Sequence, residues 1–333
     1  MIITRTPFRI SFFGGGTDYA NWYANHGGKI LSSTINKYCY INIRYLPPFF
    51  DKRSRIVWSQ IETVNFPHEI QHPVVRAGLE YLGIEAGVEV HHDGDLPARS
   101  GLGSSSAFTV GFLSALYALR GKMVGKEKLA KEAIYLERDY LKEAVGIQDQ
   151  IAVAHGGLNQ ISINKDGTFQ VQPIIISTER RALLEQHLML FFSGISRYSS
   201  DLAAAQMQAV SSNESVLRRM MEIADMGIDV LTSTDSIDHF GNLLHESWQL
   251  KKSLSSLISN DITDHIYDSA RKFGAYGGKV LGAGGGGFML IFAKPENQSA
   301  IREALKDFLE VPFNFENSGT QIIFYDNDIV PVK

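Results

Sequence analysis

The run Pro97-Ala98-Arg99-Ser100-Gly101-Leu102-Gly103-Ser104-Ser105-Ser106-Ala107 stands directly before an apolar stretch with helical spacing. Such a loop can wrap phosphate oxygens with backbone N–H groups, because glycine permits close approach and positive φ. The helix that follows offers unpaired N–H donors and the positive end of its dipole. Serine hydroxyls can cap that helix or bind a magnesium ion carried by a nucleotide. The run therefore indicates nucleotide chemistry, although an ordinary strand-to-helix connection has a similar composition.

The loop is not a Walker loop, because it contains no lysine and no Gly-Lys-Ser/Thr ends it. Charge on a bound phosphate must then be neutralised by the helix end, by a metal ion or by a cation from elsewhere in the chain.

The bulk composition favours an ordinary globular enzyme. The chain has 333 residues, of which 44% are hydrophobic and 20% are charged, with a net charge of −4. This length predicts two domains. We find no basic run typical of nucleic-acid binding, no apolar stretch of membrane-spanning length and no secretory h-region. The single cysteine, Cys39, lies in an apolar-rich run and is expected to be buried. We expect a cytoplasmic protein that binds neither nucleic acid nor membrane; its oligomeric state is left open.

Elements on both sides of the loop predict an α+β protein. The spacing of Phe108, Phe112, Leu116 and Leu119 predicts a helix that ends at Gly121. Further helices are predicted over residues 126–144, 200–232, 240–258, 263–273 and 299–309. Strands are predicted over residues 2–12, 37–46, 55–58, 88–91, 158–163, 168–176, 188–192, 288–293 and 321–325. We divide the chain into an N-terminal domain, 1–175, and a C-terminal domain, 176–333.

Three charged residues are candidates for chemistry. Glu137 lies at the edge of an apolar helical stripe, where it is either solvated or a magnesium ligand that acts with a serine, since magnesium needs few protein oxygens. Asp149, in Gly146-Ile147-Gln148-Asp149-Gln150, stands at a helix junction and is either an N-cap or a general base. Arg9 lies among apolar strand residues, so it either faces solvent or pairs with an aspartate.

Two glycine-rich turns complete the pattern. Asp18 follows Gly14-Gly15-Gly16-Thr17, where it either stabilises a turn or accepts hydrogen bonds from sugar hydroxyls. The run Gly282-Ala283-Gly284-Gly285-Gly286-Gly287 matches a dinucleotide-binding pattern. The residues after it are strand-like and fewer than fifty remain, so a dehydrogenase domain is excluded.

Taken in order, these segments resemble the kinase superfamily named for galactokinase, homoserine kinase, mevalonate kinase and phosphomevalonate kinase. Thr6 to Asp18 resembles its N-terminal substrate motif, with Arg9 where the family has Arg or Lys. Pro97 to Ala107 resembles its phosphate-loop motif with one extra serine, and Gly277 to Phe288 its C-terminal glycine-rich motif. Gly146 to Gln150 looks like the galactokinase segment whose aspartate is the proposed base.

The resemblance implies an N-terminal domain like ribosomal protein S5 domain 2, a ferredoxin-like C-terminal domain, and the use of ATP and Mg²⁺. Carried over by position, Asp149 is the base and Arg9 its electrostatic partner, while Ser105 and Glu137 hold the metal. The residues implied for ATP binding are Pro97, Arg99, Ser100, Gly101, Leu102, Gly103, Ser104, Ser105 and Ser106.

Within this superfamily, the N-terminal stretch most resembles D-glycero-D-manno-heptose 7-phosphate kinases, which phosphorylate the anomeric hydroxyl for nucleotide-heptose and surface polysaccharide synthesis. The substrate residues expected are Gly15, Gly16, Thr17, Asp18, Gln148, Arg197 and Gly285. Arg197 is a fair candidate to meet a substrate phosphate; Lys279 is another, but a solvated surface lysine is slightly favoured there.

Two other functions stay open. One is a kinase for an unphosphorylated fucose- or galactose-type sugar. The other is a non-catalytic sensor that binds sugar and ATP, against which the presence of Arg9, Ser105, Glu137 and Asp149 argues.

Overall fold

A large, mostly antiparallel sheet forms the N-terminal part of the molecule. The structure is a computed structural model that describes residues 1–195 and 213–326. The sheet has nine strands with the order β13-β1-β2-β5-β3-β4, while β6 and β12 also pair with β2 and β7 pairs with β6. Only the β3–β5 pair is parallel among the described strands. The strands are β1 (Ile2–Phe13), β2 (Gly28–Tyr45), β3 (Ser54–Val57), β4 (Ile61–Val64), β5 (Val88–Gly94), β6 (Leu158–Ile163), β7 (Phe169–Pro173), β12 (Phe315–Glu316) and β13 (Gln321–Tyr325).

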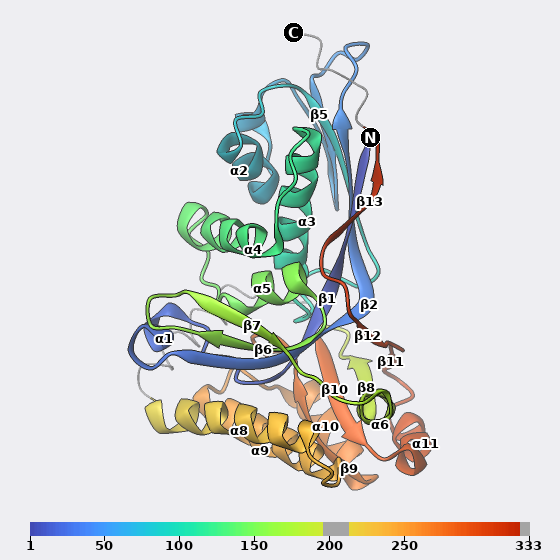
Figure 1. Cartoon of the computed structure of the whole chain (residues 1–333). Coiled ribbons are helices and arrows are strands. Elements are labelled where there is room, and N and C mark those ends of the chain that lie inside the picture. The colour runs from blue at the N-terminus through green and yellow to red at the C-terminus, as the bar shows by residue number, and fades with distance from the viewer. Residues whose placement is uncertain (196–212, 327–333) are drawn as a thin grey trace.

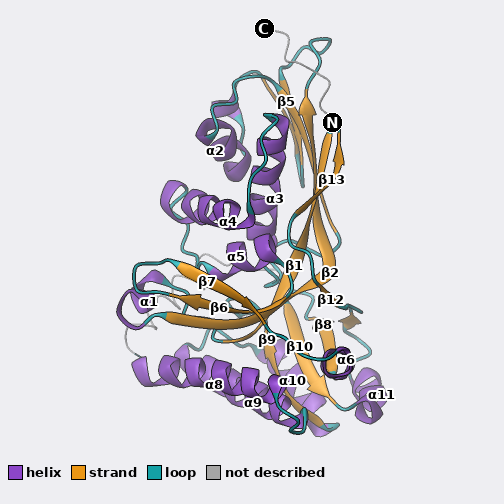
Figure 2. Cartoon of the chain, in the orientation of Figure 1, coloured by secondary structure: helices purple, strands orange, loops and turns teal. Residues whose placement is uncertain are grey.

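Helix α3 (Ser104–Leu119) is the central buried helix of this half, because it is apolar on nearly every side. It packs against β1 and β2, with α2, α4 and α5 beside it (Figures 1 and 2). The predicted helix after the serine loop is thus confirmed. The other helical segments of this half are α1 (Ala20–His26), η1 (Pro67–Glu69), α2 (Pro73–Tyr81), α4 (Lys126–Ile134) and α5 (Gln148–His155).

The helix predicted over residues 126–144 is wrong in its second half. Regular α4 ends at Ile134, and a π-helical segment, η2 (Tyr135–Tyr140), follows it. A π turn holds one more residue than an α turn. Leu136 and Glu137 are the buried residues of this segment.

The C-terminal half contains a four-stranded antiparallel sheet of order β11-β8-β10-β9. Helix α9 packs on β9, and α8 packs on α9 and reaches β1 and β2 of the first sheet (Figure 1). The elements are α6 (Thr178–Gln186), β8 (Leu188–Phe192), α8 (Glu214–Thr232), α9 (Asp238–Leu254), α10 (Asp261–Lys272), β9 (Ala275–Val280), β10 (Phe288–Ala293), α11 (Pro295–Ala304) and β11 (Leu309–Glu310).

Several predicted bounds in this half need correction. Helix α9 ends at Leu254 rather than near 258, and α11 spans 295–304 rather than 299–309 because a proline at its first turn starts it early. Residues 200–212 of the helix predicted over 200–232 lie outside the described residues, and the described part, α8, ends at Thr232 as predicted.

Strand pairing and ring packing both join the two halves. Strands β12 and β13 return from the C-terminal half to pair with β2 and β1, and the Met1 ammonium donates a hydrogen bond to the Asp326 carbonyl. Phenylalanine rings of β1 also contact the ring of Phe240 on α9. The fold is therefore a two-domain α+β arrangement with a shared sheet; the boundary near residue 175 stays a prediction.

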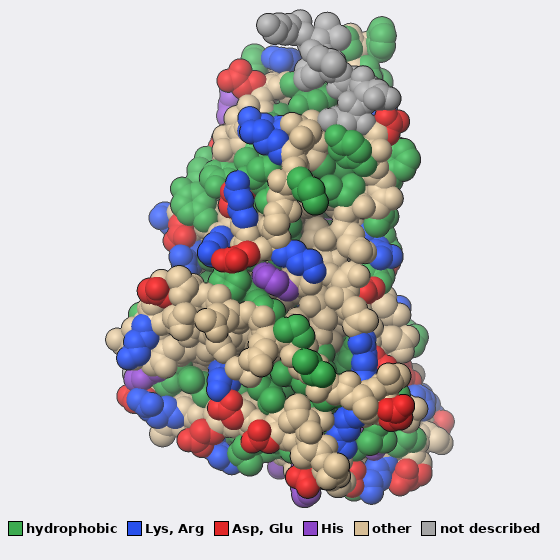
Figure 3. Space-filling model, in the orientation of Figure 1, with side chains coloured by type: hydrophobic (Ala, Val, Ile, Leu, Met, Phe, Trp, Pro, Cys, Tyr) green, Lys and Arg blue, Asp and Glu red, His purple; other side chains and the backbone are tan. Residues whose placement is uncertain are grey.

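The surface carries charges of both signs. On the face shown in Figure 3, lysine and arginine side chains are interspersed with aspartates and glutamates. None of the described helices has both the length and the apolar character needed to cross a membrane.

Candidate functional site

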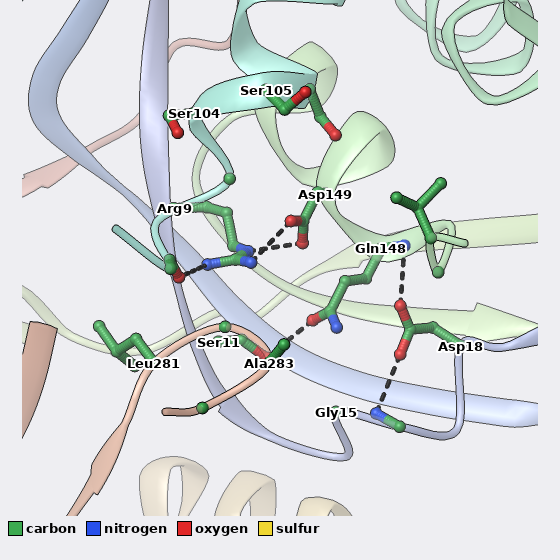
Figure 4. Close-up of a pocket in the computed structure, with 18 of the residues that line it drawn as sticks. Arg9, Ser11, Gly15, Asp18, Ser104, Ser105, Gln148, Asp149, Leu281 and Ala283 are labelled. Atoms are coloured by element: carbon green, nitrogen blue, oxygen red, sulfur yellow. Dashed lines mark hydrogen bonds and ion pairs between the residues drawn. The ribbon is translucent and has the colours of Figure 1, made fainter. Parts of the chain in front are cut away.

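Three segments that are distant in sequence line one pocket between the two halves (Figure 4). They are the turn after β1, the phosphate loop, whose wall the start of α5 completes as a fourth segment, and the glycine-rich loop after β9. The two loops touch: a Cβ on Gly101, whose φ is +86°, would lie 2.3 Å from the Leu281 carbonyl oxygen. Only glycine allows this approach, so both loops border the same cavity.

Arg9 and Asp149 form a two-pronged ion pair below the phosphate loop. The Arg9 Nε and Nη2 atoms lie 2.7 Å from Oδ1 and Oδ2 of Asp149, and Nη1 donates to the Gly101 carbonyl at 2.7 Å. The Arg9 side chain is 3% exposed, whereas that of Asp149 is 25% exposed. Arg9 therefore fixes the carboxylate in the plane of its own fork and leaves part of it open to the pocket. The ion pair predicted between these residues is confirmed.

Asp18 lies across the pocket and is almost fully buried. Its carboxylate accepts hydrogen bonds from the Gly16 amide at 3.0 Å and the Gln148 amide at 3.4 Å. Burial first, and then the negative charge of Asp149, raises the pKa of Asp18 above its usual value. Gly146 makes room for this carboxylate, because a Cβ there would lie 1.9 Å from Asp18 Oδ2.

The Gln148 side chain is oriented by β1. Its Oε1 accepts a hydrogen bond of 2.7 Å from the Ser11 hydroxyl. Gln148, Ser11, Gly15, Gly16 and Asp18 all line the pocket (Figure 4), so this wall carries hydroxyl, amide and carboxylate groups suited to a sugar.

Glu137 is buried behind the serines of the loop rather than solvated. The Ser106 hydroxyl donates to its Oε2 at 3.0 Å, and the Gln150 amide donates to the same oxygen. Burial raises the pKa of Glu137 to about 7. The other oxygen, Oε1, has no hydrogen-bond partner among the described residues.

The serine that contacts Glu137 is Ser106, and the metal pair of Ser105 and Glu137 stays a prediction. Ser106 is buried and hydrogen-bonded to the carboxylate, whereas Ser105 is exposed at the pocket. The reason is helical geometry, since consecutive residues of α3 point in directions about 100° apart.

Two lysines of the C-terminal half also line the pocket. Lys279 is 3% exposed and Lys251 is 6% exposed. A surface position for Lys279 is therefore wrong. Sequence reasoning missed Lys251, because a lysine in the last turn of a helix is usually solvated; the apolar residues three positions to either side, Trp248 and Leu254, were the available signal.

The residues predicted to bind ATP divide into those that line the pocket and those that support it from behind. Along the phosphate loop Arg99, Gly101 and Gly103 face the pocket, whereas Ser100 and Leu102 between them are buried in the protein. The Ser100 hydroxyl donates to the carbonyl of Pro97, which is exposed and does not line the pocket.

Two predicted substrate residues are likewise turned away. The Thr17 hydroxyl donates to the Gly14 carbonyl and closes the turn. The Gly285 amide donates to the Ile258 carbonyl, and its own carbonyl accepts from the Asn260 side chain. Arg197 lies outside the described residues.

Comparisons with known proteins agree with this geometry. The family model for the N-terminal domain of GHMP kinases matches residues 69–157, and the model for their C-terminal domain matches residues 232–311. The chain is 30% identical over 320 residues to D-glycero-alpha-D-manno-heptose 7-phosphate kinase of Campylobacter jejuni, which covers 92% of this chain and 93% of that one.

More distant relatives share the fold. The chain is 25% identical to the bifunctional fucokinase/GDP-fucose pyrophosphorylase of Arabidopsis thaliana over 91% of its own length and 31% of that protein. A crystal structure of a D-glycero-D-manno-heptose 1-phosphate kinase from Bacteroides thetaiotaomicron superimposes with a TM-score of 0.80 at 23% identity, covering 98% of this chain and 100% of that one. The chain belongs to the GHMP kinases, which use ATP as the phosphate donor, and within that family it is a sugar kinase.

Proposed function

We propose that this kinase transfers the γ-phosphoryl group of ATP to the anomeric hydroxyl of D-glycero-D-manno-heptose 7-phosphate, giving the 1,7-bisphosphate for nucleotide-heptose and surface polysaccharide synthesis. The observation that carries the proposal is the Arg9–Asp149 ion pair, which lies directly below the phosphate loop and is partly open to the pocket. The full-length similarity to a heptose 7-phosphate kinase supports this acceptor.

Asp149 acts as the general base in this proposal. It takes the proton of the anomeric hydroxyl as the hydroxyl oxygen attacks the γ-phosphorus and the bond to the leaving ADP oxygen breaks. An anomeric hydroxyl is more acidic than an ordinary alcohol, because the ring oxygen withdraws electron density. A general base of this kind contributes about 10²–10⁴-fold to the rate. Most of the remaining acceleration comes from positioning and charge stabilisation.

The walls of the pocket divide the two substrates. The N-terminus of α3 and the amides of the phosphate loop face the phosphates of ATP. Asp18, Gln148 and the Gly15–Gly16 turn face the sugar, where buried Asp18 accepts hydrogen bonds from its hydroxyls.

The residues around Glu137 fit a magnesium ion. Its buried Oε1 lacks a partner among the described residues, and the Ser106 hydroxyl lies 3.0 Å from its other oxygen, Oε2. Magnesium favours oxygen ligands and takes few from the protein, keeping phosphate and water in its other positions. We propose that Glu137 holds the ion with Ser106 or Ser105. When bound, the ion supplies positive charge for the transferring phosphoryl group.

A panel of acceptors tests this function. Purified protein with ATP and Mg²⁺ is assayed for ADP release with D-glycero-D-manno-heptose 7-phosphate, the unphosphorylated heptose, fucose and galactose. We expect the largest kcat/KM for the heptose phosphate. A larger kcat/KM for fucose or galactose would instead make the protein a kinase of unphosphorylated sugars, and absence of turnover with every sugar would support a sensor.

A further inference from the structure

We propose that Lys251 and Lys279 together form a phosphate-binding subsite on the C-terminal wall of the pocket, and that it receives the phosphate the acceptor sugar already carries. This inference rests on the proposed function, since it assigns the group that distinguishes a sugar phosphate from a free sugar.

Both ammonium groups donate hydrogen bonds to backbone carbonyls. Lys279 Nζ donates to the Phe12 carbonyl at 2.8 Å, and Lys251 Nζ donates to the carbonyls of Val280, at 3.1 Å, and Gly282. Neither lysine forms an ion pair with a carboxylate in the part of the chain that the structure describes. Each ammonium has three donors, so beyond these bonds Lys279 retains two and Lys251 retains one.

An uncompensated buried ammonium is costly, and a second one nearby increases the cost. The lysines nonetheless line a pocket that solvent can enter. A phosphate there would supply negative charge and acceptor oxygens to both lysines. This explains the two buried lysines as a binding site rather than as part of the core.

The position of the pair favours the acceptor over ATP. Lys279 bonds to Phe12 on β1, next to Ser11 on the sugar wall, and Lys251 interacts electrostatically with Asp18 on the same wall. The phosphate-loop side already has its own cation in Arg9, which is engaged by Asp149 and the Gly101 carbonyl. Lys251 also lies beside the contact between the two loops, because it donates to the Gly282 carbonyl, so the bond from Lys279 to Phe12 is what ties the pair to the sugar wall.

Binding should be coupled to proton uptake. Burial lowers the pKa of Lys251 to about 7 and that of Lys279 well below its usual value. Among the charges facing them, Arg9 lowers the pKa of Lys251 and Asp18 raises it, while Lys251 and then Arg9 lower the pKa of Lys279. A phosphate dianion favours the charged form of each lysine, so the complex should take up protons when it forms at pH 8.

The test uses Lys251→Met and Lys279→Met, with Lys252→Met as the matched control. Lys252 is the next residue of the same helix and pairs with Asp264 away from the pocket. We expect KM for heptose 7-phosphate to rise about 10- to 100-fold in each pocket variant, as for loss of a charge-assisted hydrogen bond. KM for ATP and the dissociation constant for unphosphorylated heptose should stay unchanged, and the control should match wild type. An increase confined to ATP, or equal losses for both heptoses, would overturn the inference.

A second measurement separates this inference from the proposed function. Calorimetric titration of the wild-type protein with inorganic phosphate, in two buffers of different ionisation enthalpy, should show binding with proton uptake, and Lys251→Met should lose both. This readout needs no turnover. If wild type binds phosphate in this way but does not phosphorylate heptose 7-phosphate, the proposed function fails while the subsite stands. If wild type does phosphorylate it and the pocket variants behave like the control, the subsite fails alone.

Discussion

Among single residues, Asp149 gives the sharpest prediction. Asp149→Asn keeps the shape of the side chain but removes the proton acceptor and places an amide beside the Arg9 fork. We expect kcat to fall about 10²–10⁴-fold while ATP binding is retained, because a base acts on the chemical step. Steady-state kinetics and ATP titration measure the two effects. Asp225→Asn, which removes an exposed ion pair with Lys29, is the control. A near-normal kcat in Asp149→Asn would remove this residue from the mechanism.

Glu137 predicts a pH dependence of stability in the metal-free protein. Its pKa is raised from 4.5 to about 7 in the folded state, so between these values the folded state binds more protons than the unfolded one. Stability therefore falls as pH rises through this window. Glu137→Gln abolishes the effect, so its free energy of unfolding relative to wild type should increase by about 2–3 kcal/mol between pH 5 and pH 8.

Urea unfolding with EDTA at the two pH values measures this difference, and other titrating groups cancel in the comparison. Glu303→Gln, on an exposed side chain, is the control. If the difference in free energy of unfolding between Glu137→Gln and wild type did not change with pH, the pKa of Glu137 would not be raised in the folded state. With ATP present, the Glu137→Gln and Ser106→Ala variants should need more Mg²⁺ for half-maximal activity.

The same residues show what sequence reasoning can reach at this scale. The Arg9–Asp149 pair was predictable because each residue occupies a motif position and a buried arginine needs an acid. The contact of Ser106, rather than Ser105, with Glu137 was not predictable, because it depends on the rotation of α3 about its axis. Lys251 was missed because its sequence neighbourhood is that of a solvated helix end, and only the packing of α9 against β9 buries it.

At the scale of elements, the contact between the phosphate loop and the glycine-rich loop after β9 determines the shape of the pocket. Gly101→Ala would combine a positive φ with a clash against the Leu281 carbonyl. We expect a loss of about 1–2 kcal/mol from the backbone conformation and about 1–3 kcal/mol more from the clash, together with a higher KM for ATP.

Gly121→Ala is the matched control, because Gly121 has a φ of +65° just beyond the other end of α3 and nothing lies within 4 Å of its added Cβ. Gly121→Ala should lose only the stability that corresponds to the positive φ, and its KM for ATP should equal that of wild type. Thermal unfolding and ATP kinetics of both variants decide the point; equal KM values would show that the loops do not need to touch.

Predictability also differed among elements. Helix α3 and the strands around it follow from local apolar spacing, so their existence could be read directly. The π-helical η2 could not, because one extra residue in a turn leaves the local composition of a helix intact while shifting every later side chain.

For the whole molecule, we expect the two halves to unfold together, because the ring of Phe240 packs against strands of both. Its centroid lies 5.4 Å from that of Phe12 and 4.9 Å from that of Phe13 on β1, and 6.0 Å from that of Phe292 on β10. Phe240→Ala should cost about 3–5 kcal/mol and still show one transition by fluorescence and circular dichroism. Phe49→Ala, at a side chain that is 89% exposed, should change stability by less than about 0.5 kcal/mol. Two separate transitions in wild type would contradict this account.

The return of β13 to β1 illustrates why the global arrangement was harder to predict than its parts. The strand itself was predicted from residues 321–325, but its partner lies more than 300 residues away. Nothing local specifies such a pairing, whereas the order of the motifs did place the phosphate loop, the base and the glycine-rich loop around one pocket.

The central claim is transfer to the anomeric oxygen of a heptose phosphate. The most direct test is ³¹P NMR of the protein incubated with ATP, Mg²⁺ and D-glycero-D-manno-heptose 7-phosphate. The account predicts a new phosphate resonance coupled to the anomeric proton, an unchanged 7-phosphate resonance, and ADP in equal amount. Release of ADP without that resonance, or its formation with fucose or galactose but not with the heptose phosphate, would contradict it.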